Sequence, residues 1–309
     1  MATYVALRNT SKLRERIEAA VSLLENCCLC PHSCGVNRPA GDTGRCRTPR
    51  EAMVSSYGPH FGEEAPLVGK HGSGTIFFAN CNLSCLFCQN YPISQLGQGQ
   101  KVSKEELAQI LLALQARECH NINLVSPTHV VPQVLEALEL AAESGLLLPL
   151  VYNRDGYDSV ETLLMLDGIV DISMPDMKYD DKHVAEELSR IENYPVINKA
   201  AVKEIHRQVG DLKVDEHGIA QRGLLVRHLV LPHGLAGTKG IVDFLSGEIS
   251  RNTYVNIMAQ YQPCHDASQV PSLSRPISAT EFREAVSLAR EAGLNRLDKD
   301  APLGILHLN

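Results

Sequence analysis

The chain has 309 residues, 44% hydrophobic and 21% charged, which excludes an intrinsically disordered chain and a coiled-coil rod. Twenty-nine lysines and arginines against 36 aspartates and glutamates give a net charge of −7, which argues against a nucleic-acid binder that works by general electrostatics. No apolar run reaches the roughly 18–20 residues that cross a bilayer, and charged residues interrupt the N-terminus where a targeting signal would lie. We therefore expect a cytoplasmic protein with no membrane contact.

The ten cysteines are concentrated in the first third of the chain. Eight of them lie between residues 27 and 88, and only Cys119 and Cys264 lie beyond. In a cytosolic chain of this size, metal or redox chemistry explains such a concentration better than disulfides do. Cys119 and Cys264 are interpreted as buried small apolar residues, with a contact to substrate as the alternative for Cys264.

The first part of the chain has little periodicity. Residues 11–25 place apolar side chains at helical spacing and predict a short amphipathic helix. From residue 27 to about 72 the chain is rich in Cys, Gly and Pro, and it predicts little regular structure. We expect two units, an irregular extension over 1–72 and a folded domain over 73–309.

From residue 74 onward, short apolar strands alternate with helical stretches, which predicts right-handed βαβ crossovers and a parallel sheet. The expected strands are 75–79, 121–125, 147–152, 169–173, 224–231 and 254–258. The expected helices are 104–117, 131–143, 160–166, 184–190, 197–208, 241–250 and 279–292, with a hairpin turn at 215–218. The fold class is α/β, and six strands favour a partial (β/α)6 TIM-type barrel over an open doubly wound sheet.

Cys81, Cys85 and Cys88 form the pattern C-x3-C-x2-C directly after the first of these strands. In parallel α/β folds the loops at the C-terminal strand ends carry the active site, so this group lies where chemistry is expected. Three thiolates can hold three irons of a 4Fe-4S cluster and leave the fourth iron open for a cofactor or substrate. The alternative is a zinc site that a distant histidine completes.

This loop, with Phe87 before its last cysteine, resembles the cluster loop of the radical S-adenosylmethionine (radical SAM) superfamily. Further segments resemble the pyruvate formate-lyase activating enzyme-like proteins that carry a cysteine-rich N-terminal extension. They are EEAP at 63–66, GSGTIFF at 72–78, CQNY at 88–91, NINLVSPTH at 121–129, the segment 151–162 and MPDMKY at 174–179. The resemblance runs from Cys27 to about Pro263, but Arg154 and Asp155 stand where that group is expected to have small polar residues.

The resemblance implies that S-adenosylmethionine chelates the fourth iron, and that one electron from the reduced cluster cleaves its sulfonium. The resulting 5'-deoxyadenosyl radical then takes a hydrogen atom from the substrate. The implied substrate is a glycine of a partner glycyl-radical enzyme, with flavodoxin or ferredoxin as electron donor. The alternatives are a different peptide, an RNA base or a small molecule, and, in another class, an iron-sulfur electron carrier or a zinc-stapled binding module.

The resemblance also implies which strand ends contact the cofactor. Ser126 and Thr128 stand where the superfamily often has a Gly-Gly-Glu-Pro-like segment that receives the methionine amino group, and a plain turn is the alternative. Asn153 is expected to hydrogen-bond the ribose or carboxylate. Asp176 and Lys178 resemble the Asp-x-Lys segment of the activating enzymes, and we expect them to act catalytically by orienting the carboxylate and sulfonium.

Three further residues complete the candidate site. Phe87 is assigned to cofactor binding from its place in the cluster loop. His228 lies in an apolar strand, where a core histidine and a cofactor contact are equally open. His129 receives no role.

Cys27, Cys30, Cys34 and Cys46 give C-x2-C-x3-C-x11-C, which predicts a second, closed metal centre holding zinc or a 4Fe-4S cluster. Residues 27–72 have few apolar side chains to offset roughly 1–2 kcal/mol of ordering entropy per residue, so a metal is expected to hold them. Iron-sulfur is favoured because the same chain is expected to carry another cluster. Cys28 is the alternative to Cys27, although its one-residue gap to Cys30 makes chelation awkward.

Overall fold

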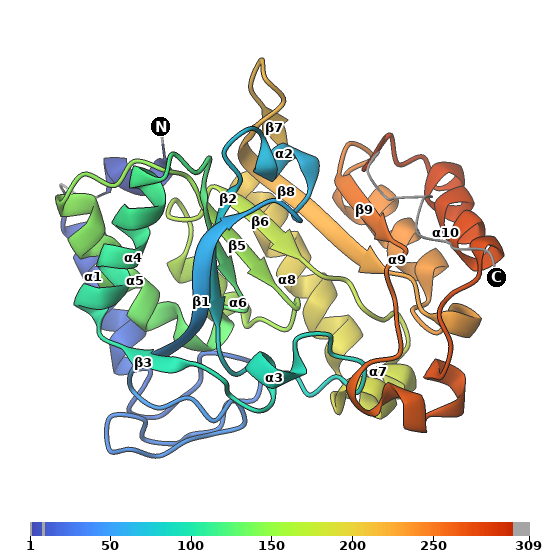
Figure 1. Cartoon of the computed structure of the whole chain (residues 1–309), viewed down its shortest axis with the longest axis horizontal. Helices are drawn as coiled ribbons and strands as arrows, with labels where there is room; N and C mark the ends of the chain where they lie inside the picture. Colours follow the sequence, from blue (N-terminus) through green and yellow to red (C-terminus); the bar gives the residue numbers. More distant parts are fainter. Residues whose placement is uncertain (1, 8–9, 299–309) are drawn as a thin grey trace.

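The computed structural model describes residues 2–7 and 10–298, in which ten strands form one mixed sheet (Figure 1). The sheet runs in the order β10-β9-β8-β6-β5-β4-β2-β1-β3, and β7 pairs with β8 outside this path. Six parallel strands correspond to the six predicted from the sequence: β2 (Ser73–Phe78), β4 (Ile122–Val125), β5 (Leu150–Arg154), β6 (Ile172–Pro175), β8 (Ala220–Leu229) and β9 (Tyr254–Met258). Because the described strands form an open path, the predicted partial barrel is confirmed.

The short strand β10 (Arg296–Leu297) adds two parallel residues beside β9. The hairpin at 215–218 is also confirmed, since β7 (Lys213–Val214) runs antiparallel to β8 and the amide of Asp215 donates to the carbonyl of Ile219. The central strands are nearly continuously buried, which is the pattern of a parallel sheet covered on both faces.

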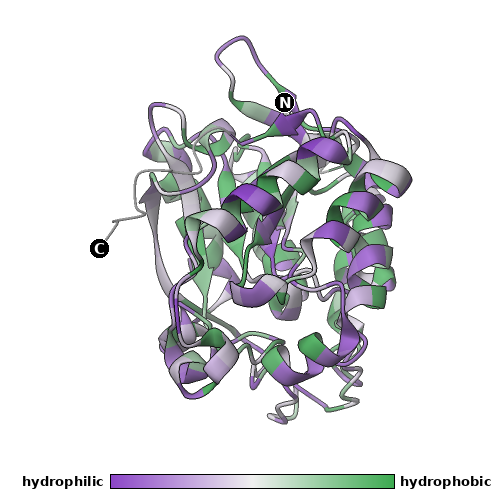
Figure 2. Cartoon of the chain, turned by 90° about the vertical axis from the view of Figure 1, so that its right-hand side faces the viewer, coloured by the Kyte–Doolittle hydropathy of each residue, from purple (hydrophilic) through white to green (hydrophobic). Residues whose placement is uncertain are grey.

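Helices cover the sheet along most of its length. They are α1 (Ser11–Ser22), α4 (Lys104–Ala116), α5 (Val131–Glu143), α6 (Val160–Met165), α7 (Lys182–Ser189), α8 (Tyr194–Val209), α9 (Thr238–Phe244) and α10 (Ala279–Glu291). Figure 2 shows mainly apolar colour on the inner strands and alternating colour along the outer helices. Both capping boxes read from the sequence form, at Ser103 with Glu106 and at Ser278 with Glu281. No helix among the described residues is both long and apolar enough to cross a membrane.

The expectation of little regular structure over 27–72 is wrong for its second half. Strand β1 (Ala52–His60) pairs antiparallel with β2 and with β3 (Gln100–Val102), and α2 (Ala65–Val68) follows it. The sequence pattern does not indicate β1, because three of its residues are exposed in succession and a register shift lies between Val54 and Ser56. Residues 27–51 form only turns and bends, as expected.

The pairing of β1 places part of the extension in the same sheet as the predicted domain 73–309. The division at residue 72 therefore stays a prediction, and residues 299–309 lie outside the described residues. The C-terminal ends of the parallel strands point to the lower edge in Figure 1, where α3 (Tyr91–Ser94), α7 and the loops of residues 27–51 also lie. The fold thus brings both cysteine-rich segments to one edge of the sheet.

The packing of α5 gives a direct test of this architecture. Leu138 on α5 is fully buried, whereas Leu164 on α6 is 49% exposed. Replacing Leu138 with Ala removes buried methyl groups and leaves a cavity, so we expect Leu138→Ala to lose about 2–5 kcal/mol of unfolding free energy. Leu164→Ala is the matched control, with a change near zero. Urea denaturation followed by circular dichroism measures both, and equal losses would contradict the packing described.

Candidate functional site

The loop after β2 carries the three closely spaced cysteines. Asn80 turns the chain there with a positive φ of 70°, a conformation that Asn adopts more readily than most residues. Its side-chain amide donates to Thr48 Oγ1 at 3.2 Å, and its backbone N–H donates to the carbonyl of Ile93 at 3.0 Å. The start of the loop is therefore fixed by contacts to two distant segments.

Each thiol of this loop contacts a different element. The Cys81 thiol donates to Asp155 Oδ2 at 3.1 Å, just beyond the end of β5, and accepts from the backbone N–H of Leu83 at 3.3 Å. The Ser189 hydroxyl, at the end of α7, donates to Cys85 Sγ at 3.0 Å. The Cys88 thiol lies 3.1 Å from the hydroxyl of Ser94 in α3. The loop is thus held among three elements at the C-terminal edge of the sheet.

Burial raises the pKa of two of these thiols, those of Cys81 and Cys85. It raises the pKa of Cys85 to about 11, against the opposing charge of Lys178, and burial together with Asp155 raises the pKa of Cys81. Such thiols become thiolate ligands when a metal supplies positive charge. A set of three cysteines, with hydroxyls and a carboxyl group beside them, fits a 4Fe-4S cluster with one open iron.

Across residues 2–7 and 10–298, no three His, Cys, Asp or Glu side chains are arranged as a site for a single metal ion. The assignment of Cys81, Cys85 and Cys88 as ligands therefore stays a prediction from spacing, from position and from the chemistry of the donor set.

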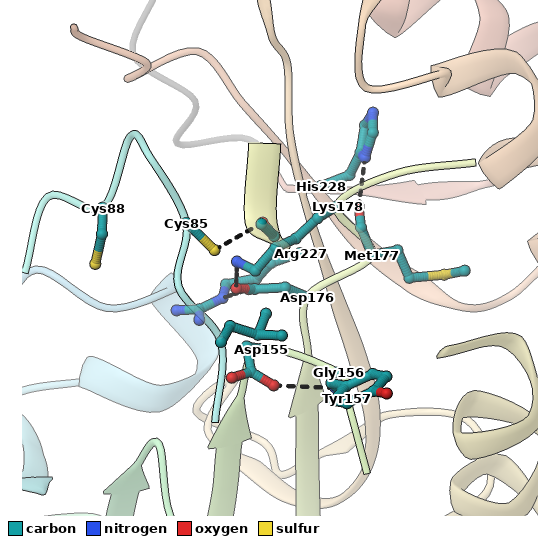
Figure 3. Close-up of polar contacts among 12 residues, drawn as sticks. Cys85, Cys88, Asp155, Gly156, Tyr157, Asp176, Met177, Lys178, Arg227 and His228 are labelled. Atoms are coloured by element: carbon teal, nitrogen blue, oxygen red, sulfur yellow. Dashed lines mark hydrogen bonds and ion pairs between the residues drawn. The ribbon is translucent and has the colours of Figure 1, made fainter. Parts of the chain in front are cut away.

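Beside this loop, three strand ends meet in a buried ionic network (Figure 3). Asp176, directly after β6, accepts from Arg227 Nε at 2.8 Å and from Lys178 Nζ at 2.6 Å. Arg227, in β8, also donates to Asn153 Oδ1 in β5 at 2.8 Å. The structure thus brings together Asn153, Asp176 and Lys178 as the sequence predicted. The structure also places Arg227 in this network. In the sequence, Arg227 was distinguished only as a charged residue within an apolar strand.

The electrostatics of this network favour its charged state. Burial opposes ionisation of Asp176, but Arg227 and Lys178 outweigh it and hold the pKa of the carboxyl below its ordinary value. In turn, Asp176 overcomes the burial of Lys178 and Arg227 and raises the pKa of both. Asp176 thus holds the cations of Lys178 and Arg227 side by side at the strand ends.

The carboxyl groups of Glu63 and Glu64 reach the same region. The sequence predicted no role for them beyond the resemblance of the EEAP segment. Glu63 Oε2 lies 3.9 Å from Arg227 Nη1, and Asn256 Nδ2 donates to Glu64 Oε1 at 3.0 Å. The second Glu64 oxygen, Oε2, is buried without a partner. Burial, and then the neighbouring Glu64, raise the pKa of Glu63 to about 7, although Arg227 opposes this.

Other candidates point into the protein interior. The Thr128 hydroxyl donates to Asp158 Oδ1 at 2.8 Å, and Ser126 turns the chain with a positive φ of 56°. Phe87 packs edge-on against Tyr179 and Tyr261, with ring centroids 6.3 and 5.9 Å away. The hydroxyl proton of Thr128 is thus already donated to Asp158, and Phe87 serves as a packing residue.

The histidines also have internal partners. Both ring nitrogens of the fully buried His228 are engaged, with the carbonyl of Met177 at 2.7 Å and with Thr238 Oγ1 at 2.8 Å. Burial lowers the pKa of His228, so a neutral core histidine accounts for it. His129 is likewise buried, and its Nε2 contacts the carbonyl of Ala79 at 3.0 Å.

The unexpected pair Arg154 and Asp155 is buried beneath the cysteine loop. Arg154 pairs with Asp158, donates to Ser173 Oγ at 2.9 Å and lies 4.5 Å over the ring of Tyr152. Burial and the nearby Asp158 raise the pKa of Asp155 to about 6. Arg154 thus lies on the same face of β5 as Tyr152, the face that α5 covers, and Asp155 faces Cys81.

The sequence predicts that Cys119 and Cys264 are buried small apolar residues, and this prediction is confirmed for only one of them. Cys119 is buried, as expected for a small apolar residue, whereas Cys264 is half-buried in the segment after β9. The structure brings neither of them into the contacts of the cysteine loop described above.

The fold is an open α/β barrel of the kind seen in a radical SAM methyltransferase from Sphaerobacter thermophilus. The two superpose with a TM-score of 0.50 at 16% identity, over 72% of this chain and 64% of that chain, so this chain spans less than two thirds of the methyltransferase. A structure of TYW1 with a lysine-pyruvate adduct bound aligns over 72% of this chain and 74% of that chain, at 10% identity and a TM-score of 0.42.

In sequence, the chain is 33% identical over 290 residues to the uncharacterized protein MJ0674 of Methanocaldococcus jannaschii. The match covers 91% of this chain and 79% of the relative, and the chain belongs to the same family as that protein. No family model matches the chain.

The raised pKa of Glu63 predicts a pH effect on stability. Because its folded pKa of about 7 lies above the ordinary value of 4.5, Glu63 contributes stability below pH 4.5 that is lost as pH rises through about 7. We expect Glu63→Gln to flatten this decline in unfolding free energy, measured by urea denaturation between these pH values. Glu118→Gln, whose side chain is 78% exposed, is the control. An unchanged pH slope in Glu63→Gln would show that Glu63 does not titrate in this way.

Proposed function

We propose that this protein is a radical SAM enzyme in which Cys81, Cys85 and Cys88 hold a 4Fe-4S cluster. The observation that carries the proposal is the position of the C-x3-C-x2-C loop, which follows β2 at the C-terminal edge of the sheet beside the ionic network of Asp176. The open barrel that this chain shares with a radical SAM methyltransferase supports it. Four strand ends thereby surround the space beside the predicted open iron.

When bound and reduced, the cluster supplies the electron that cleaves the sulfonium of S-adenosylmethionine and yields a 5'-deoxyadenosyl radical for hydrogen abstraction. The residues of the chain bind and orient the cofactor. Lys178 and Arg227 offer the cations that a carboxylate needs, and Asp176 fixes both in place. Asn153 already accepts from Arg227 and has its amide N–H groups available for a polar group of the cofactor. The burial of this network limits competing contacts with water.

For the substrate we propose a glycine of a partner glycyl-radical enzyme, with flavodoxin or ferredoxin as electron donor. Support comes from the sequence resemblance of the cysteine loop and of Asp176 and Lys178 to the activating enzymes. The strand order leaves the sheet unclosed, and we propose that a polypeptide substrate enters at its open side. A different peptide, an RNA base or a small molecule would use the same cofactor site. Thiolate and iron-sulfur chemistry of this kind fits a reducing, cytoplasmic location.

The three loop cysteines provide the main test. We expect anaerobically reconstituted protein, given dithionite and S-adenosylmethionine, to form 5'-deoxyadenosine, and each of Cys81→Ala, Cys85→Ala and Cys88→Ala to abolish its formation. Two thiolates cannot hold a cluster with one open iron. Cys119→Ala is the matched control, because Cys119 is buried away from the loop.

Product is measured by chromatography, alongside iron and sulfide content. Retained cleavage in even one of the three variants would reject the ligand assignment. Absence of 5'-deoxyadenosine from cluster-loaded wild-type protein would leave the electron carrier or binding module as the better interpretation.

Lys178 tests the cofactor orientation separately from cluster binding. Lys178→Met removes one cation but leaves Asp176 paired with Arg227, so the fold is expected to persist. We expect the dissociation constant for S-adenosylmethionine to rise about tenfold or more, since a hydrogen bond to a charged group is worth about 1.5–3 kcal/mol. Equilibrium dialysis against labelled cofactor, at equal iron content, measures the effect.

The control for this variant is Lys199→Met. Lys199 forms an ion pair of the same 2.6 Å length with Asp180, but at a more exposed position. We expect it to bind the cofactor as the wild type does. An unchanged affinity in Lys178→Met would remove Lys178 from the cofactor site.

A further inference from the structure

Four of the five cysteines of the extension lie around one small cavity of about 10 Å³. Its lining consists of Cys27, Cys30, Cys34 and Cys46 together with Leu29, Arg38, Gly44 and His129. Cys28 is exposed and takes no part in the lining. The fold of residues 27–46 thus gathers the four cysteines that the spacing had selected, and it turns the alternative, Cys28, away from them.

The backbone holds this group in a tight loop. The amide of Cys27 donates to the carbonyl of Val36 and the amide of Gly35 donates to the carbonyl of Cys27, both at 3.0 Å. The backbone N–H of Arg45 donates to Cys34 Sγ at 3.4 Å. Gly44 packs so closely on Cys34 that an added Cβ would lie 2.7 Å from its sulfur. Hydrogen bonds to sulfur and close backbone approach are the kind of support that thiolate metal centres receive from their surroundings.

A buried cation beside the cavity gives a second, independent observation. Arg38 is only 1% exposed, and its hydrogen bonds within the described structure go to the carbonyl oxygens of Pro49 and His129. No carboxylate of the described residues forms an ion pair with it. A buried guanidinium without a counter-charge is unfavourable, so the site calls for an anion.

We propose that Cys27, Cys30, Cys34 and Cys46 bind a second metal centre through four thiolates, and that Arg38 balances its negative charge. Four thiols lose four protons to solvent on binding, and the resulting centre carries net negative charge when it holds a 4Fe-4S cluster, or one zinc once the four side chains have moved closer together than in the described structure. The proposal goes beyond radical SAM chemistry and does not depend on it, because it involves none of the cysteines of the loop after β2.

The extension and His129, which lines the same cavity, also contact the chain on both sides of Cys81. His129, which lines the cavity, contacts the carbonyl of Ala79 at 3.0 Å. His32, two residues after Cys30, contacts the carbonyl of Asn82 at 2.7 Å and packs edge-on against Tyr157. A metal that fixes the extension would therefore also fix the base of the cysteine loop.

The test is metal and sulfide analysis of anaerobically purified full-length protein that carries Ala at Cys81, Cys85 and Cys88, which isolates the second centre. We expect either about one zinc without sulfide or about four irons with about four sulfides per chain. Adding Cys27→Ala is expected to reduce the metal content at least about fivefold, whereas adding the matched control Cys28→Ala leaves it unchanged. Either metal supports the proposal, and the analysis distinguishes the two.

Two outcomes would overturn it. One is a folded triple variant, judged by circular dichroism, that contains neither zinc nor iron. The other is equal metal content in the Cys27→Ala and Cys28→Ala proteins. Since the readout is metal content in a background unable to cleave S-adenosylmethionine, failure here and failure of the proposed radical chemistry are separate results.

Gly44 and Arg38 extend the test beyond the ligands. Gly44→Ala should lose metal because its Cβ meets the Cys34 sulfur, whereas Gly247→Ala, at a position without a positive φ and with nothing within 4 Å of the added Cβ, should retain it. Arg38→Met should release metal to a chelator faster than wild type, and Arg38→Lys should restore part of the retention. Equal release from the Arg38→Met and wild-type proteins would refute the charge-balancing role.

Discussion

The arrangement of the site depends on one buried carboxylate, that of Asp176, paired with two cations at the edge of the sheet. Arg227 and Lys178 reach it from β8 and from the chain just beyond β6, and Arg227 continues to Asn153 on β5. Such a network is stable only when every member keeps its partner, because an unpaired charge in this environment is costly. The three strand ends are therefore fixed relative to one another by charge as well as by backbone hydrogen bonds.

An open barrel explains why so many polar groups lie inside this fold. A closed barrel fills its interior with branched apolar side chains, whereas the interior of this unclosed sheet carries the charged network of Asp176. On the opposite face of β5, Arg154 pairs with Asp158 and donates to Ser173. Because neighbouring residues of a strand face opposite sides of the sheet, Asn153 belongs to the network of Asp176 and Arg154 does not.

The six parallel strands and both capping boxes were predictable because each leaves a local pattern: an apolar run between turns, or Ser-x-x-Glu before a helix. The two groups of cysteines could be selected for the same reason, because their close spacing is a local pattern. Glu63 and Arg227 were not, because they lie far apart in the chain and meet only through the fold. Strand β1 was missed because a strand with three exposed residues in succession carries no clear alternation.

The loop after β2 shows how an irregular segment acquires a defined shape. The loop forms no strand pairing of its own, so its shape depends on contacts with other segments. These contacts join Thr48 to Asn80, His129 to the carbonyl of Ala79 and His32 to the carbonyl of Asn82. All three partners lie outside the loop, and two belong to the extension. Contacts that hold the backbone on both sides of Cys81 keep its thiol directed at Asp155, so the extension acts as structural support for the cysteine loop.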